Sequence, residues 1–144
     1  MGIYLEKPEI FNPKFEIVSS FCEFNNEFIL LLRQDHKPEP NTLWVPAWKI
    51  DEWEDSLQAI KREIKEETWI ILEDKDINFY KKIFVKYPTY DFIYYMFYVN
   101  FLERPEVIIN QKEHKEFIWT NPIDSLQLNL IWWLNECIRL FYKI

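Results

Sequence analysis

The sequence predicts one α/β domain in which a mixed β-sheet is packed between helices. Three observations indicate this fold class. The 144 residues match the length of a single domain with its own core. Runs of strand-forming residues alternate with two stretches of helical periodicity. One predicted strand, residues 91–101, is apolar on both faces, so we expect other elements to cover both of its sides.

The first elements form a hairpin. Residues 15–24 and 27–33 are rich in strand-forming residues, and Asn25-Asn26 between them is typical of a tight turn. Residues 34–42 are polar and contain prolines, so they are predicted to form a loop. A short extended segment then leads into a second loop.

A helix follows this loop. Asp55 is a good N-cap and begins a capping-box pattern. Leu57, Ile60 and Ile64 recur at helical spacing and define the face toward the core. The pattern ends near Thr68.

The second half supplies three more strands, predicted at residues 79–87, 91–101 and 115–120. A short helical turn starts at Asn121-Pro122, and a closing helix is predicted at residues 130–142. Pro88 marks the turn between the first two of these strands. In the closing helix we expect an inward-facing stripe made of Ile131, Leu134, Ile138 and Phe141.

Composition and charge narrow the function classes. A formal net charge of −7 argues against a surface that binds nucleic acid, because phosphate backbones need a basic patch. The chain has no apolar run of transmembrane length and no signal-peptide pattern, so we expect a cytoplasmic protein without membrane contact. Cys22 and Cys137 lie far apart and are predicted to be buried free thiols.

Three glutamates of the predicted helix carry the functional signal. Glu63 and Glu67 lie one turn apart, and Glu66 lies on the other side of Glu63, so that all three share one flank. Such a cluster can be an acidic face in solvent. It can also bind a divalent cation, since hard cations take oxygen ligands. Glu54 and Arg62, at fixed offsets from the cluster, favour the second interpretation.

Residues 48–70 resemble the box of the Nudix hydrolase family, written G-x5-E-x7-R-E-U-x-E-E-x-G-U with U aliphatic. The matching residues are Glu54, Arg62, Glu63, Ile64, Glu66, Glu67 and Ile70. Weaker similarity covers most of the chain, including the stretch from Val45 to Asp51 and a downstream segment around Glu113. The resemblance is to MutT-like members and implies an α/β/α sandwich that hydrolyses a nucleoside diphosphate linked to another moiety.

The resemblance also implies roles for residues. Glu63, Glu66 and Glu67, with the backbone carbonyl of Ala47, would bind Mg²⁺, with Mn²⁺ as the alternative ion. Glu54 and Arg62 would pair and fix the joint between loop and helix.

We favour Glu66 as the general base and keep Glu63 and the loop residue Glu113 as alternatives. His114 is a weaker candidate, since an exposed structural histidine is the commoner case.

Substrate contacts are predicted at Trp48, Lys49 and Tyr94. Tyr87, Tyr90 and Tyr94 could stack on a nucleobase, although core packing is the expectation for most of them. Trp119 is expected to pack under the last helix.

The glycines of the family pattern are replaced. Trp44, Trp48, Trp53 and Trp69 stand where Nudix proteins carry glycine, and Gly2 is the only glycine in the chain. We therefore expect backbone strain of roughly 1–2 kcal/mol at each such site that needs a positive φ. Our hypothesis is that glycine codons of the source gene were read as tryptophan; a deliberate series of substitutions is the alternative.

Two functions remain open. The first is a Mg²⁺-dependent pyrophosphohydrolase, acting on nucleoside triphosphates, including oxidised ones, rather than dinucleotides. The second is a Nudix-fold module that binds nucleotide or protein without turnover, because tryptophan fills the loop. The high aromatic content is compatible with a homodimer.

Overall fold

The fold is organised around a mixed β-sheet whose central strands are β2 (Pro13–Phe24) and β7 (Asp91–Asn100). The computed structural model describes residues 2–144. β2 and β7 run parallel, whereas the other strand pairs are antiparallel. The main path through the sheet is β1-β6-β7-β2-β3-β4, with β5 paired to β2 and β8 paired to β3. The mixed sheet predicted from the sequence is confirmed.

The remaining elements have the following bounds. The strands are β1 (Gly2–Tyr4), β3 (Glu27–Arg33), β4 (Leu43–Trp44), β5 (Ala47–Lys49), β6 (Asn78–Lys86) and β8 (His114–Thr120). The helices are α1 (Ser56–Thr68), the short 3-10 helix η1 (Asp74–Asp76), α2 (Pro122–Ser125) and α3 (Leu134–Tyr142).

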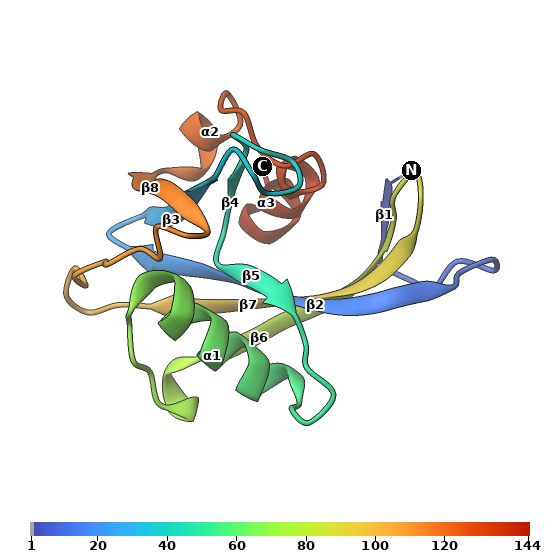
Figure 1. Ribbon diagram of the computed structural model, residues 1–144, viewed down its shortest axis with the longest axis horizontal. Coiled ribbons are helices and arrows are strands. Elements are labelled where there is room, and N and C mark those ends of the chain that lie inside the picture. The colour runs from blue at the N-terminus through green and yellow to red at the C-terminus, as the bar shows by residue number, and fades with distance from the viewer. Residues whose placement is uncertain (1) are drawn as a thin grey trace.

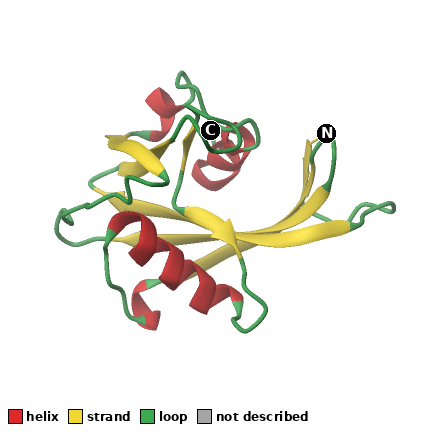
Figure 2. Ribbon diagram, viewed as in Figure 1, coloured by secondary structure: helices red, strands yellow, loops and turns green. Residues whose placement is uncertain are grey.

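Helices cover the two faces of the sheet. Figure 1 shows α1 on one side of the central strands and α3 on the other, and Figure 2 shows the same layers by secondary structure. The strand β7 contributes to both interiors: Tyr94 and Met96 belong to the core beneath α3, while Phe97 and Val99 belong to the core beneath α1. The prediction that residues 91–101 are covered on both sides is confirmed.

The predicted hairpin is present. Asn25 and Asn26 both adopt positive φ, at 51° and 64°, and join β2 to β3. Positive φ at both central residues is the backbone of a type I′ turn, which asparagine tolerates better than most residues. The register pairs Glu23 with Phe28.

The structure differs from the sequence-based prediction at four elements. β1, β5 and η1 were not predicted, since each is only three residues long and too short to show a period. The last helix begins at Leu134 rather than at residue 130. Before it, the backbone extends beside β4, and the Ile131 N–H donates to the Leu43 carbonyl at 3.0 Å. This pairing prevents the first predicted turn of the helix.

Two further expectations concern cysteine and membrane. Cys22 and Cys137 are both free and buried, as predicted. Within residues 2–144, every helix is too short or too polar to cross a membrane.

Candidate active site

Helix α1 presents its carboxylates along the edge of its core-facing side. Asp55 accepts a hydrogen bond from the Gln58 backbone N–H, and the Gln58 side chain accepts one from the Asp55 backbone N–H, which is the predicted capping box. Ile60 and Ile64 are fully buried against the sheet. Their burial fixes the rotation of the helix and thereby the direction in which the glutamates project.

Four carboxylates line one small pocket of about 120 Å³. Glu63, Glu66 and Glu67 come from α1, and Glu113 comes from the loop before β8. Glu63 and Glu67 retain only 3% and 8% of their surface, whereas the Glu66 side chain is 55% exposed. We call this cavity the carboxylate pocket. It brings together the three predicted carboxylate ligands and all three candidate bases, whereas Ala47, the fourth predicted ligand, is not among the residues that line it.

Arg62 ties the acidic groups to the loop. Its guanidinium makes a two-pronged ion pair with Glu54, in which Nε lies 3.0 Å from Oε2 and Nη2 lies 2.5 Å from Oε1. The same side chain reaches Glu63 at 2.6 Å and Glu66 at 3.2 Å. The predicted pairing of Glu54 with Arg62 is therefore present. The hydrogen bond from Arg62 holds the pKa of Glu54 below its usual value despite burial.

The two buried glutamates, Glu63 and Glu67, have raised pKa values. Burial raises the pKa of Glu63 to about 7, although Arg62 opposes the shift. Burial, followed by the charge of Glu63, raises the pKa of Glu67 well above its usual value. Two carboxylates that repel each other in a place with little water favour either a proton or a cation between them.

The pocket has the donor chemistry of a Mg²⁺ or Mn²⁺ site but not a finished ligand set. Among residues 2–144, no three His, Cys, Asp or Glu side chains are already arranged to hold a metal ion. Arg62 instead engages Glu63 and Glu66, and the Ala47 backbone N–H donates to Glu67 at 2.9 Å. The ligands gathered here are carboxylate oxygens, which suit hard divalent cations, and the crowding of Glu63 with Glu67 is the kind of repulsion that a cation relieves.

A second cavity of about 230 Å³ adjoins the carboxylate pocket. We call it the aromatic pocket, because Phe15, Trp44, Trp48, Tyr90 and Trp133 form much of its wall. Lys14, Lys49 and Glu39 add charge to it. Arg33 and Trp48 line both cavities. Two predicted substrate contacts, Trp48 and Lys49, therefore lie in this pocket.

The profile of the NUDIX domain matches residues 16–141, which is most of the chain. The protein belongs to the Nudix family. Its architecture is the Nudix fold, an α/β/α sandwich around a mixed sheet. No curated protein sequence matches the chain.

Solved structures agree on the fold. A MutT protein from Methanosarcina mazei superposes with a TM-score of 0.78 at 18% identity, covering 94% of this chain and 97% of the other. The Nudix domain of Shewanella oneidensis NrtR, crystallised with ADP ribose, gives 0.78 at 16% identity, covering 96% and 92%. An Ap4A hydrolase from Caenorhabditis elegans gives 0.68 at 20% identity, covering 89% and 96%.

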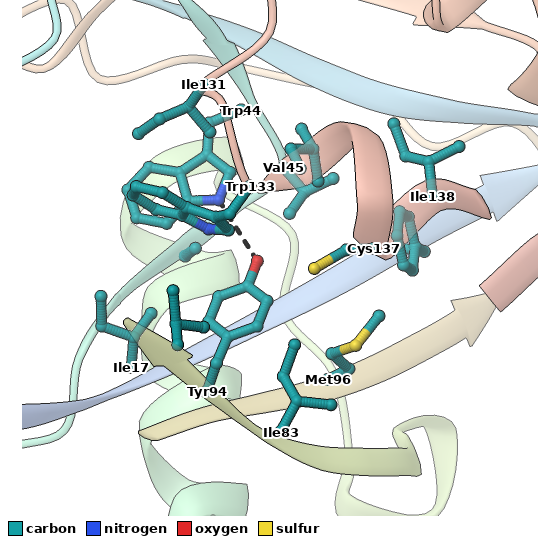
Figure 3. Packing of buried hydrophobic residues seen from close by; sticks show 14 of the residues in the cluster. Ile17, Trp44, Val45, Ile83, Tyr94, Met96, Ile131, Trp133, Cys137 and Ile138 are labelled. Carbon is teal, nitrogen blue, oxygen red and sulfur yellow. Dashed lines mark hydrogen bonds between the residues drawn. The ribbon is translucent and has the colours of Figure 1, made fainter. Parts of the chain in front are cut away.

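Tyr94 does not contact substrate from its place in this fold, so that prediction was wrong. Its side chain is 1% exposed and lies in the core beneath α3. Figure 3 shows its hydroxyl directed at Trp44, whose indole N–H donates to it at 3.3 Å. Tyr94 points toward the core from β7, whereas Tyr90, which precedes the strand, lines the aromatic pocket.

The expected strain at the Nudix glycine positions is present at one tryptophan. Trp69 ends α1 with φ 63° and ψ 16° in the left-handed region. Trp44, Trp48 and Trp53 are not among the positive-φ residues of the described chain, so these three positions do not carry this strain. Trp44 and Trp48 lie in the short strands β4 and β5, where extended backbone accepts any side chain.

Two other residues differ from their predictions. His114 is 4% exposed rather than a surface histidine, and burial, followed by the charge of Arg33, lowers its pKa to about 4. Trp119 packs against the core beneath α1, not under the last helix. It follows Ile118 along β8 and so faces the opposite side of the sheet from it.

Arg33 is the site residue that the sequence-based reasoning missed. A signal was available, because Arg33 ends a strand whose preceding residues, 28–32, are all apolar. A charge in that position has to be explained by a partner or a ligand. Phe15 and Trp133 gave no comparable signal, since aromatic residues in these patterns are read as core.

Proposed function

We propose that this Nudix protein hydrolyses a phosphoric anhydride bond in a nucleoside diphosphate derivative, with Mg²⁺ bound in the carboxylate pocket. The best candidate reaction converts a nucleoside triphosphate, oxidised or not, to the monophosphate and pyrophosphate. One observation carries the proposal: the carboxylate pocket and the aromatic pocket adjoin through Arg33 and Trp48. A nucleotide has one part for each, since its base stacks on aromatic rings and its phosphates bind a metal ion.

Glu63, Glu66 and Glu67, with the Ala47 carbonyl, are the residues that we propose hold the ion. A bound Mg²⁺, or Mn²⁺, would neutralise charge on the phosphate oxygens and lower the pKa of a coordinated water. For this, Glu63 and Glu66 must exchange their bonds to Arg62 for bonds to the ion. Arg62 keeps Glu54 as its partner, so the loop remains fixed to the helix.

The chemical step needs a base for the attacking water. The water oxygen forms a bond to one phosphorus of the anhydride, and the bond from that phosphorus to the bridging oxygen breaks. The bridging oxygen leaves with the other phosphate group, and the proton of the water passes to a carboxylate. We propose Glu66, because its side chain is the most exposed of the three helix glutamates. Glu63 and Glu113 line the same pocket and are the alternatives.

The ligands of structurally similar proteins support nucleotides as the proposed substrate class. The Shewanella oneidensis domain was crystallised with ADP ribose, and the Caenorhabditis elegans protein is an Ap4A hydrolase. Each of these molecules contains a nucleoside joined to a chain of phosphates. The same chemistry fits two adjoining pockets of aromatic and acidic character.

The activity can be tested with nucleoside triphosphates, oxidised triphosphates and ADP-ribose in the presence of Mg²⁺. We expect release of pyrophosphate or monophosphate that is lost on chelation with EDTA and falls at least a hundredfold in Glu67→Gln. The matched control is Glu116→Gln, which removes an exposed carboxylate outside both pockets. Equal rates in wild type and Glu67→Gln would refute the proposal.

A second candidate is nucleotide binding without turnover. It is favoured by Trp48, whose indole lines both cavities where the Nudix pattern has glycine. If the indole obstructs the passage of the phosphates, Trp48→Gly should raise kcat/KM. Trp53→Gly is a useful companion, because Trp53 occupies another replaced position and is 74% exposed. Unchanged rates in both variants would show that the loop tolerates tryptophan.

A further inference from the structure

Two arginines line the carboxylate pocket, and their surroundings differ. The guanidinium of Arg62 donates hydrogen bonds to Glu54, Glu63 and Glu66. The guanidinium of Arg33 donates only through Nε, to the Pro38 carbonyl at 2.8 Å. Within residues 2–144, the two Nη atoms of Arg33 form neither a hydrogen bond nor an ion pair with protein. Arg33 is therefore a cation whose principal donors are free.

Arg33 is also held in place. It ends β3, where it pairs with His114 next to a register shift in the ladder with β8, and it keeps only 5% of its surface. Its guanidinium carbon lies 5.5 Å from the Trp44 ring centroid and 5.6 Å from that of Trp48. These two rings and the Pro38 carbonyl fix the plane of the guanidinium. Orientation by ring contacts leaves its terminal N–H groups available.

The free donors keep some access to the two pockets. The Nη atoms are not among the buried atoms without a partner, and Arg33 lines both the carboxylate pocket and the aromatic pocket. Glu67, Glu113 and Glu39 are close enough to stabilise its charge, yet none of them pairs with it. A guanidinium enclosed in this way loses hydration that an anionic ligand would replace.

We propose that Arg33 binds the phosphate group next to the nucleoside, at the junction of the two pockets. The inference rests on the proposed function and adds a substrate-binding residue outside the Nudix box. If the base occupies the aromatic pocket and a metal-bound phosphate occupies the carboxylate pocket, the phosphate attached to the nucleoside lies between the two. Arg33 lines both pockets and therefore lies beside that phosphate. Its planar fork matches two phosphate oxygens. Holding that group would align the anhydride bond with the glutamates.

The test compares ligands that differ in this phosphate. Adenosine, AMP and α,β-methylene-ATP are titrated calorimetrically, in Mg²⁺, into wild type and Arg33→Gln. We expect adenosine affinity to change less than twofold, while AMP and α,β-methylene-ATP bind ten- to a hundredfold more weakly, the usual effect of losing charge-assisted hydrogen bonds. Arg33→Lys keeps the charge without the fork and should lose less.

The matched control is Arg104→Gln. Arg104 lies 4.7 Å from the Trp119 ring centroid, so it repeats the stacking of Arg33, but it lines neither pocket. We expect its affinities to equal those of wild type. Equal loss of adenosine and AMP binding in Arg33→Gln, or unchanged AMP binding, would overturn the assignment.

Two provisions keep the outcome decisive. If Arg33→Gln does not fold, wild type and Arg33→Lys decide, because wild type must bind AMP at least tenfold more tightly than adenosine and Arg33→Lys must reduce that ratio. The hydrolase proposal is judged separately by Glu67→Gln turnover. A protein that hydrolyses nothing but prefers AMP through Arg33 would refute the reaction alone, whereas full Glu67-dependent turnover with no role for Arg33 would refute this inference alone.

Discussion

The left-handed C-cap of α1 allows a test in which glycine should be more stable than alanine. Trp69 has φ 63°, and its N–H closes the helix by donating to the Lys65 carbonyl. Trp69→Gly and Trp69→Ala both remove the indole and differ only in the Cβ atom. The Cβ costs roughly 1–2 kcal/mol in this conformation, and the greater freedom of unfolded glycine offsets roughly 0.5–1 kcal/mol. We therefore expect the free energy of unfolding of Trp69→Gly to be about 1 kcal/mol higher than that of Trp69→Ala.

Urea unfolding followed by far-UV circular dichroism measures the difference, which corresponds to about 3 °C in Tm for a chain of this size. Lys65 provides the control, since it is an exposed residue within the same helix. At this position the free energy of unfolding of Lys65→Ala should be about 1 kcal/mol higher than that of Lys65→Gly, which is the usual order inside a helix. The reversal between the two positions is the result that matters. If alanine is the more stable residue at both, Trp69 does not occupy the left-handed region.

Three further predictions follow from burial and charge. Trp44→Gly should lower the free energy of unfolding by about 3–5 kcal/mol, because the indole is 2% exposed; a loss below about 1 kcal/mol in urea unfolding would contradict its place in the core. Glu54→Gln should cost about 2 kcal/mol, since it weakens a buried ion pair with Arg62, and Glu52→Gln on the exposed loop should cost nothing measurable by the same assay. His114 has a folded pKa of about 4 against 6.5 when unfolded, so the unfolded state binds the extra proton and stability falls as pH drops from 6.5 toward 4. The total loss is about 3 kcal/mol, and His114→Gln should show a shallower decline over this range; parallel curves for the two proteins would refute it.

The sequence predicted those elements whose patterns are long or chemically specific. The capping box at Asp55 and the asparagine turn at 25–26 fix backbone geometry through a few atoms, and both are present. The spacing of Glu63, Glu66 and Glu67 placed them on one flank because an α-helix has a single period. All three line one pocket.

Features that depend on contacts between distant segments could not be read from the sequence. β5 exists because Ala47–Lys49 pairs with β2, and residues 130–131 extend because Leu43 offers a carbonyl. Tyr94 is another example. Both faces of β7 are apolar, so the sequence pattern does not tell which of its tyrosine side chains will be buried by the elements that pack on the sheet. The apolar run before Arg33 marks its charge as unusual, but the pairing of β3 with β8 that places Arg33 beside the pocket is not encoded by any local pattern.

The arrangement of the glutamates also explains why the helix must be so firmly anchored. Glu63 and Glu67 are buried beside each other, and their raised pKa values mean that, without a cation, the folded state holds these charges at a cost. The core contacts of Ile60 and Ile64 offset that cost, since both are fully buried on the adjoining face. A less anchored helix would rotate the carboxylates toward water and relieve the repulsion. Rigid packing thus keeps the pocket in a state that a divalent ion and a polyphosphate would stabilise.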